Sequence, residues 1–207
     1  MSFAAGLTAI PPHGSGLRIG LFGGSFNPIH DGHRLVAEQC LKRLGLDAVW
    51  LLVSPGNPLK DNDSLPSLEA RVRAARARLR HPRLVATGLE AQRGYRYTVD
   101  TLIWLKRSCP DTHFVWIMGA DNLAQFHRWE SWRDIAQLMP IAVYDRPGAT
   151  LRAMAALAAQ SLAPHRIPEQ RARELPLADP PAWTLLTGVT SALSSSAIRL
   201  GRASGTK

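Results

Sequence analysis

A chain of 207 residues that is 45% hydrophobic and 20% charged has the size and composition of one ordinary globular domain, which excludes a disordered chain. Lysine and arginine outnumber aspartate and glutamate 25 to 16, yet no apolar run approaches the roughly 18 residues of a membrane span, so we expect no membrane partner. Residues 1–16 lack the features of a secretory signal, which predicts a short flexible tail before a single cytoplasmic domain over residues 17–207.

Short apolar runs alternate with helical patterns along the chain, and each run predicts a strand. The expected strands are residues 17–22, 48–53, 84–87, 113–118, 141–144 and 183–186. The expected helices are residues 32–44, a segment beginning at Ser67, and residues 98–106, 131–139, 151–159 and 194–200. This alternation indicates an α/β fold, a Rossmann-like, doubly wound and mostly parallel sheet with helices on both faces.

One long connecting region and the turns after the strands complete the predicted organisation. Residues 164–181 hold five prolines without sustained periodicity, so we expect a mobile loop there. In doubly wound sheets ligands bind at the carboxyl ends of the strands, where the strand order reverses. The turns that follow the first four strands are therefore the places where a site is expected.

The predicted helix after Ser67 carries much of the positive charge, with six arginines within residues 71–83. Four apolar residues recur there at the spacing of one buried helix face. They are Leu68, Val72, Ala75 and Leu79. The arginines then mostly occupy a solvated face, and we expect no nucleic-acid partner, although a basic nucleic-acid-binding protein is the alternative. A substrate with several phosphates is a second explanation for the basic surface.

The densest polar signal is the segment GGSFNPIHDGH, residues 23–33, which links the first strand to the first helix. Paired glycines let the backbone approach a ligand, and the helix N-terminus offers N–H groups and a partial positive charge to an anion. The segment is neither G-x-G-x-x-G nor a Walker loop. It predicts a phosphate-binding turn.

Three interpretations compete for His30 and His33, whose spacing places both imidazoles on one helix face. They can be structural histidines, metal ligands or donors to a polyphosphate. Metal ligands would need a third donor at helical spacing, which we do not find in the sequence. Donors to a polyphosphate need only the adjacent anion-binding turn, so we prefer that interpretation and expect no protein-bound metal.

A serine cluster, Ser194–Ser196, precedes Arg199 near the C-terminus. Such a cluster can cap a helix, and its N–H and O–H groups can also hold phosphate oxygens. Together with the glycine and histidine turn, it suggests two anchors on one triphosphate.

The turn GGSFNPIHDGH and the segment SSSAIR, residues 194–199, together resemble the paired signatures of the nucleotidyltransferase superfamily that carries an H-x-G-H motif. Three further segments resemble one branch of it, the nicotinate-nucleotide adenylyltransferases. They are residues 97–102 (YTVDTL), residues 118–123 (MGADNL), and residues 126–129 (FHRW) with Trp132. The resemblance extends over residues 18–202, but Leu59 stands where relatives often have a histidine.

The resemblance implies that the 5′-phosphate of nicotinate mononucleotide attacks the α-phosphorus of ATP, which gives the dinucleotide and pyrophosphate in NAD biosynthesis. The reaction needs no protein nucleophile, so catalysis consists of positioning and charge stabilisation. ATP and nicotinate mononucleotide are the expected partners, with Mg²⁺ carried by the ATP phosphates. The alternative acceptors are nicotinamide mononucleotide and another phosphate such as phosphopantetheine.

The resemblance also assigns residues to roles. The expected catalytic residues are His30, His33 and Arg199. The expected ATP-binding residues are Gly23, Gly24, Ser25, Phe26, His30, His33, Gly119, Asp121, Ser195, Ser196 and Arg199. The expected residues for nicotinate mononucleotide are Asn27, Lys60, Thr98 and Trp129. Simpler roles stay open for some of them: a solvated lysine for Lys60, a helix N-cap for Asp121 or Thr98, and a core side chain for Trp129.

Overall fold

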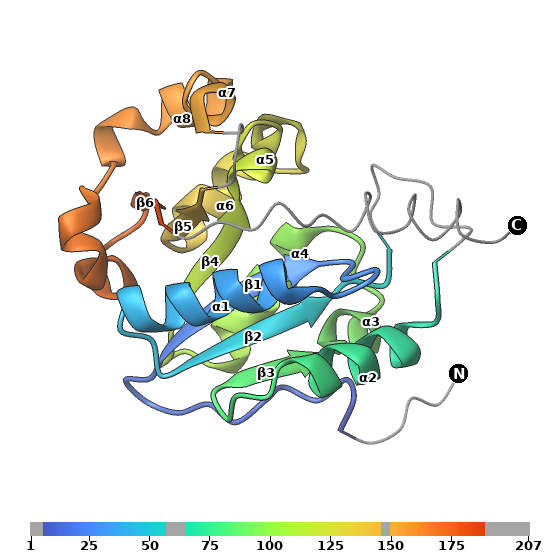
Figure 1. The fold of residues 1–207 in the computed structure, drawn as a ribbon. Helices are drawn as coiled ribbons and strands as arrows, with labels where there is room; N and C mark the ends of the chain where they lie inside the picture. The colour runs from blue at the N-terminus through green and yellow to red at the C-terminus, as the bar shows by residue number, and fades with distance from the viewer. Residues whose placement is uncertain (1–5, 57–64, 146–149, 189–207) are drawn as a thin grey trace, which may run out of the picture.

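The computed structural model describes residues 6–56, 65–145 and 150–188 and shows a six-stranded sheet in the order β3-β2-β1-β4-β5-β6 (Figure 1). Every neighbouring pair of strands is parallel. The strands are β1 (Arg18–Gly24), β2 (Ala48–Val53), β3 (Leu84–Thr87), β4 (His113–Gly119), β5 (Ile141–Tyr144) and β6 (Trp183–Leu186). All six predicted strands are confirmed.

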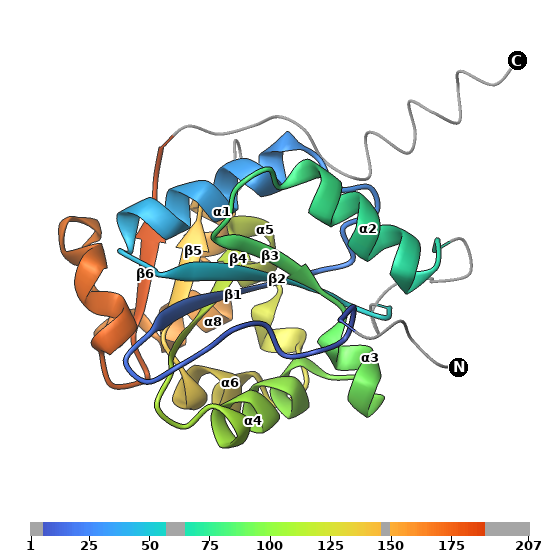
Figure 2. The same ribbon diagram turned by 90° about the horizontal axis from the view of Figure 1, so that it is seen from below.

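Helices cover both faces of the sheet, as Figure 2 shows for α1 and α2 on one side and α4 and α6 on the other. The α-helices are α1 (Asp31–Arg43), α2 (Leu68–Arg78), α3 (Leu89–Arg93), α4 (Thr98–Ser108), α5 (Ala120–Leu123), α6 (Trp132–Leu138), α7 (Thr150–Met154) and α8 (Leu157–Ser161). The 3₁₀ helices are η1 (Phe126–Arg128), η2 (Ala163–His165) and η3 (Glu169–Leu177). The helix expected at residues 151–159 is thus two short helices, and the one expected at residues 194–200 lies outside the described residues.

Two apolar cores lie on the two faces of the sheet. Trp50, Trp116 and Phe126 belong to the core beneath α4 and α6, and Leu51 and Ile117 belong to the core beneath α1 and α2. Because adjacent residues of one strand point into different cores, each strand is apolar on both faces. The doubly wound, parallel architecture is therefore confirmed. In the part of the chain that is described, none of the helices has the length and apolarity needed to span a membrane.

The strand order reverses between β1 and β4. The chain runs from β1 to β2 and β3 on one side of this pair, and from β4 to β5 and β6 on the other. Pairing of β1 with β4 extends from Arg18 with His113 to Phe22 with Ile117. The carboxyl ends of these two strands, and the turns that follow them, consequently lie side by side at the switch point.

The segment before β1 differs from the flexible tail that we expected at residues 1–16. Leu7 is buried, and its carbonyl oxygen accepts a hydrogen bond of 2.8 Å from the N–H of Gly88. At the other end, the N–H of Gly16 donates to the carbonyl of Asp111 over 2.8 Å. From residue 6 onward the segment is therefore attached to the domain. It has no regular secondary structure, and so its sequence carries no periodic signal.

Residues 164–181, which we expected to form a mobile loop, are an ordered part of the domain, so that prediction is wrong. Leu175 of η3 is fully buried, and the N–H of Ile167 donates to the carbonyl of Trp183 over 2.7 Å. The 3₁₀ helix has three residues per turn, and prolines interrupt the pattern further. Sequence reasoning that searches for periods of 3.6 or 2 residues therefore misses this kind of order.

Candidate active site

The glycine pair forms the end of β1 rather than a turn after it. A methyl group on Gly23 would lie 2.4 Å from Cη2 of Trp116, and one on Gly24 would lie 3.2 Å from Cζ of Phe26. The first distance is far inside van der Waals contact. Gly23 is therefore required by the indole packed against it, in addition to any role in ligand approach.

Phe26 holds the turn in an unusual backbone conformation. Its φ of 44° lies in the left-handed region, which costs a bulky residue about 1–3 kcal/mol. Its ring is buried and meets the rings of Phe22 and His33 edge-on, with centroid distances of 5.5 Å and 5.0 Å. This aromatic packing stabilises the strained turn.

His30 and His33 come together at the start of α1, as their spacing predicts. His30 is the N-cap residue, and its ring stacks on that of His33 with centroids 3.8 Å apart. The backbone N–H of His30 donates to Nδ1 of His33 over 3.3 Å. Because Nδ1 of His33 accepts this bond, the proton of a neutral ring is on Nε2.

The pair sits at the positive end of a 13-residue helix. The helix begins directly after the turn, at the carboxyl edge of the sheet next to the switch point. Two imidazoles and the partial positive charge of a helix N-terminus make this corner well suited to bind an anion. Asn27 lies in the same turn, between Phe26 and His30.

Gly119 and Asp121 lie at the end of the neighbouring strand. Gly119 is the last residue of β4 and also the N-cap of α5. Asp121 is exposed in the first turn of α5, so the alternative that Asp121 is the N-cap is wrong. The fold thus places Gly119 beside the turn that ends β1, because β1 and β4 are adjacent.

Thr98 and Trp129 lie on the face of the sheet that α4 and α6 cover. The N-cap of α4 is Tyr97, and Thr98 is the first helical residue, so the cap role expected for Thr98 is wrong by one position. The ring of Trp129 is partly buried and packs edge-on against Phe126 and Trp116, with centroids 5.4 Å and 6.2 Å apart. The ring of Trp116 therefore packs against Trp129 and also lies against the backbone of Gly23.

The remaining candidates, Lys60, Ser195, Ser196 and Arg199, lie outside the described residues, as does Leu59. Among the residues that are described, no three His, Cys, Asp or Glu side chains gather in a group able to hold a metal ion.

Sequence reasoning missed Arg71, which we counted among the solvated arginines. Its side chain is 4% exposed and donates to four backbone carbonyls, including that of Ser25 in the turn. Burial lowers the pKa of its guanidinium. Position 71 lies four residues before Ala75 and eight before Leu79, which is the spacing of the buried face. That spacing was the available signal.

Glu90 is a second buried charged residue that sequence reasoning missed, in the unpredicted helix α3. Burial raises the pKa of its carboxyl group to about 7, although the Thr101 hydroxyl, which donates to it over 3.2 Å, acts in the opposite direction. Thr101 belongs to α4, one helical turn beyond Thr98. The start of α4 is thus packed against a carboxyl group that is partly protonated at neutral pH.

Comparison with known proteins places this geometry among nucleotide-transferring enzymes. The family model described as "Cytidylyltransferase-like" matches residues 21–201. A protein of Methylorubrum extorquens (strain PA1), named "Probable nicotinate-nucleotide adenylyltransferase", is 56% identical over 183 residues, which are 88% of this chain and 99% of the relative. A protein of the same name from Brucella suis biovar 1 (strain 1330) is 51% identical over 183 residues, 88% of this chain and 94% of the relative.

A solved structure supports the fold independently. The Plasmodium falciparum nicotinic acid mononucleotide adenylyltransferase complexed with NaAD superposes with a TM-score of 0.66 over 89% of this chain and 83% of that one. The two sequences are only 16% identical, so the likeness concerns the arrangement of the chain in space.

Proposed function

The chain belongs to the nicotinate-nucleotide adenylyltransferase family, and on that premise we propose that it transfers the adenylyl group of ATP to nicotinate mononucleotide in NAD biosynthesis. The products are nicotinate adenine dinucleotide and pyrophosphate. One structural observation supports this proposal most directly. His30 and His33 stack at the N-terminus of α1, beside the point where the strand order reverses.

The reaction breaks the bond between the α-phosphorus of ATP and the oxygen that joins it to the β-phosphate. The α-phosphorus forms a new bond to a 5′-phosphate oxygen of the mononucleotide, and pyrophosphate leaves. The attacking phosphate is already an anion, so the protein has to align the groups and stabilise the charge that develops on pyrophosphate. We assign this stabilisation to His30 and His33, with Arg199 as a third donor. Donors already held in place by the fold lose little freedom when the charge develops.

ATP is proposed to lie across the carboxyl ends of β1 and β4. The backbone of the turn would contact the phosphates, and Gly119 with Asp121 would contact the adenosine, since a carboxylate can accept from ribose hydroxyls. The turn residues concerned are Gly23, Gly24, Ser25 and Phe26. Ser195 and Ser196 complete the proposed ATP contacts.

Nicotinate mononucleotide is proposed to bind on the side of Trp129. The indole can stack on the pyridine ring, and the start of α4 at Thr98 offers N–H groups to the carboxylate. Asn27 and Lys60 are the proposed partners of the mononucleotide phosphate. The Plasmodium structure, complexed with NaAD, shows that a protein of this fold holds the product of the proposed reaction.

Mg²⁺ is proposed to arrive with the substrate, as the complex of ATP with the metal. It would neutralise part of the triphosphate charge while the protein side chains hold the phosphate oxygens. We place the reaction in the cytoplasm and expect the rate to depend on Mg²⁺ at constant ATP.

No nucleic-acid partner belongs to this proposal, because the arginines of α2 are engaged within the chain. Arg73 pairs with Glu69, and Arg78 pairs with Asp31. Binding to DNA or RNA would appear as an affinity that falls steeply with salt. We expect no such binding at physiological salt.

The test is pyrophosphate release from ATP and Mg²⁺, with nicotinate mononucleotide and nicotinamide mononucleotide supplied separately to the wild-type protein and to His33→Ala. We expect strong preference for the acid in the wild type and little activity in the variant. Preference for the amide would retain the chemistry and refute the assigned acceptor. Release with phosphopantetheine alone would refute the pyridine site altogether.

A further inference from the structure

One side chain joins the two connections that leave the first two strands of the sheet. Arg71, in the first turn of α2, donates through Nη1 to the carbonyl of Ser25 over 3.0 Å and to that of Ser54 over 2.7 Å. Ser25 directly follows β1, and Ser54 directly follows β2. A single nitrogen thus bridges the turn that carries the histidines and the connection from β2 to α2.

The rest of the guanidinium binds the two described ends of that connection. Nη2 donates to the carbonyl of Pro55 over 3.1 Å, and Nε donates to that of Pro66 over 2.9 Å. A backbone bond supports the same junction, since the N–H of Ser54 donates to the carbonyl of Gly24 over 3.0 Å. All four bonds that the structure gives Arg71 end on carbonyl oxygens, so its positive charge is retained.

From this arrangement we propose that Arg71 is a positioning residue for adenylyl transfer, which fixes the phosphate-binding turn relative to the carboxyl end of β2 at Ser54 and Pro55. The proposal rests on the function proposed above, because the ATP phosphates are assigned to this turn and the acceptor has to be aligned with them. A planar guanidinium with donors in a fixed fork can hold several carbonyls from different segments at once. In-line transfer is sensitive to errors of about 1 Å in the relative position of the reactants, which can cost about 100-fold in rate.

The variant Arg71→Lys distinguishes the effect of the guanidinium geometry from the effect of the positive charge. It keeps the positive charge, but its donors sit on one nitrogen and cannot reach four carbonyls in the geometry of the fork. We therefore expect Arg71→Lys to lower kcat by about 10-fold to 100-fold while the KM of each substrate changes little. If the charge alone matters, kcat of Arg71→Lys will equal that of the wild type, and the proposal is refuted.

Arg76 of the same helix provides a matched control. Its guanidinium also binds carbonyls, those of Ala86 over 3.0 Å and Gly6 over 2.7 Å, but these lie away from the turn. Arg76→Met should lower the melting temperature without changing kcat of the folded enzyme. A drop in kcat as large for Arg76→Met as for Arg71→Lys would mean that general loosening of the fold explains both variants.

Rescue by free guanidinium makes the test specific to the side chain. In Arg71→Ala, millimolar guanidinium should restore part of kcat by occupying the vacated position, with no gain for Arg76→Met or the wild type. Failure of guanidinium to raise kcat, together with wild-type kcat in Arg71→Lys, refutes the role of Arg71. Failure of the wild type itself to release pyrophosphate refutes the proposed function instead.

If the wild type is inactive, hydrogen exchange still tests whether Arg71 fixes the position of the turn. Amides of residues 25–30 should exchange faster in Arg71→Lys than in Arg76→Met if Arg71 holds the turn. Equal exchange rates in the two variants would refute the proposal without any measurement of activity.

Discussion

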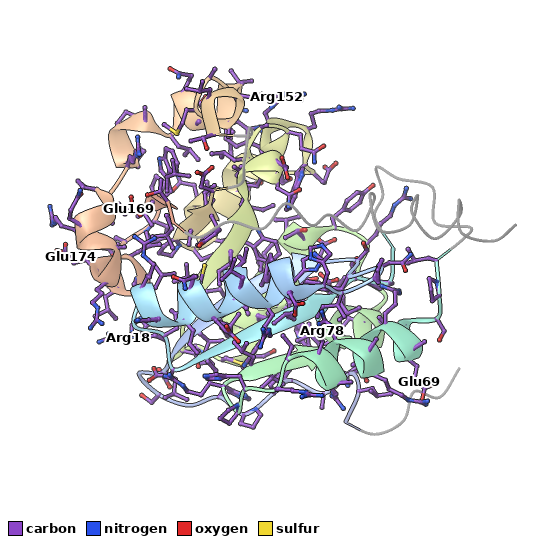
Figure 3. The ribbon with its side chains drawn as sticks, in the orientation of Figure 1. Arg18, Glu69, Arg78, Arg152, Glu169 and Glu174 are labelled. Atoms are coloured by element: carbon purple, nitrogen blue, oxygen red, sulfur yellow. The ribbon has the colours of Figure 1, made fainter. Side chains whose placement is uncertain are left out.

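Two corners of the molecule are each held by an arginine, but the arginines bind different partners. At the carboxyl ends of β1 and β2, the partners of Arg71 within the described residues are carbonyl oxygens. At the other corner, Arg43 at the end of α1 binds the carboxylate of Glu169 and the carbonyl of Thr187. Figure 3 shows Glu169, with Glu174, on the opposite side of the molecule from Glu69 of α2.

The difference separates the corner to which we assign the proposed reaction from a corner that contributes to stability. Glu169 neutralises Arg43, and Leu175 anchors the same segment in the core. The corner at Arg71 has a buried cation that, among the described residues, is bonded to carbonyl oxygens and not to a carboxylate, and the turn it contacts holds a strained phenylalanine. A buried cation and a strained backbone both cost stability. Changes in the first corner should therefore affect turnover, and changes in the second should affect folding.

The largest effect is expected from His33→Ala. Loss of a donor to the developing charge should lower kcat by about 100-fold to 1,000-fold, with a small change in the free energy of unfolding. His81→Ala is the matched control, because Nδ1 of His81 also accepts a backbone N–H, that of Arg83 over 3.2 Å, away from the turn. Steady-state kinetics and urea unfolding of both variants measure the two quantities. If His33→Ala lowers the free energy of unfolding and leaves kcat unchanged, the distinction between the two corners is contradicted.

Leu175→Ala should have the opposite signature. Removing a fully buried leucine costs about 2–5 kcal/mol of unfolding free energy, while kcat and KM of the folded protein stay near wild type. Leu177, in the same 3₁₀ helix, is 54% exposed, so Leu177→Ala should cost little. Equal stability of the two variants in urea unfolding would show that the segment is not anchored in the core.

Glu90→Gln tests whether a second buried charge, in α3, also lowers stability. The pKa of Glu90 is about 7 in the folded protein and 4.5 in its ordinary state, so the unfolded chain loses this proton first as pH rises. The wild type therefore loses stability between these two values, by at most about 3 kcal/mol. Glu90→Gln should be more stable than the wild type at pH 8 and nearly equal at pH 4. The exposed Glu130→Gln is the control, and the same difference at both pH values would contradict this account.

The smallest effect is expected from Glu169→Gln. Burial raises the pKa of Glu169, but the hydrogen bonds from Arg43 and Thr187 outweigh it, and the net pKa is lowered. The stability that these bonds contribute is present above the ordinary pKa of glutamate and is lost as pH falls through the lowered value. At pH 7 Glu169→Gln should lose about 1–2 kcal/mol, and the loss should shrink as the pH falls below the ordinary pKa of glutamate. Glu174→Gln, whose partner Arg171 is exposed, should show no comparable loss.

The strands could be predicted because most of their residues are buried on both faces, so that the charged residue of β1, Arg18, stands at its first position. The beginning of α2 could also be predicted, since the Ser67 hydroxyl accepts from the N–H of Ala70 as a capping serine should. The stacked histidines follow from their spacing alone. These features depend on residues that are close together in the sequence.

What could not be predicted depends on distant partners. The burial of Arg71 requires the carbonyl of Ser25, which is far from it in the sequence. The order of residues 164–181 requires β6, and the attachment of Leu7 requires Gly88. The cap of α4 falls on Tyr97 instead of Thr98, a shift that local sequence does not resolve. Residues within a local motif are therefore easier to predict than the residues that contact the motif from distant parts of the chain.

The parallel pairing of β1 with β4 has a consequence for synthesis of the protein. Phe22 and Ile117 are adjacent in the sheet, yet most of the first half of the chain separates them. On a ribosome the histidine turn is synthesised long before β4. The entropy cost of closing this long loop is met only when β1 pairs with β4, so the pair cannot form until β4 has emerged. Nascent chains that end before β4 should therefore bind no nucleotide, and the capacity to bind should appear abruptly once β4 has left the ribosome.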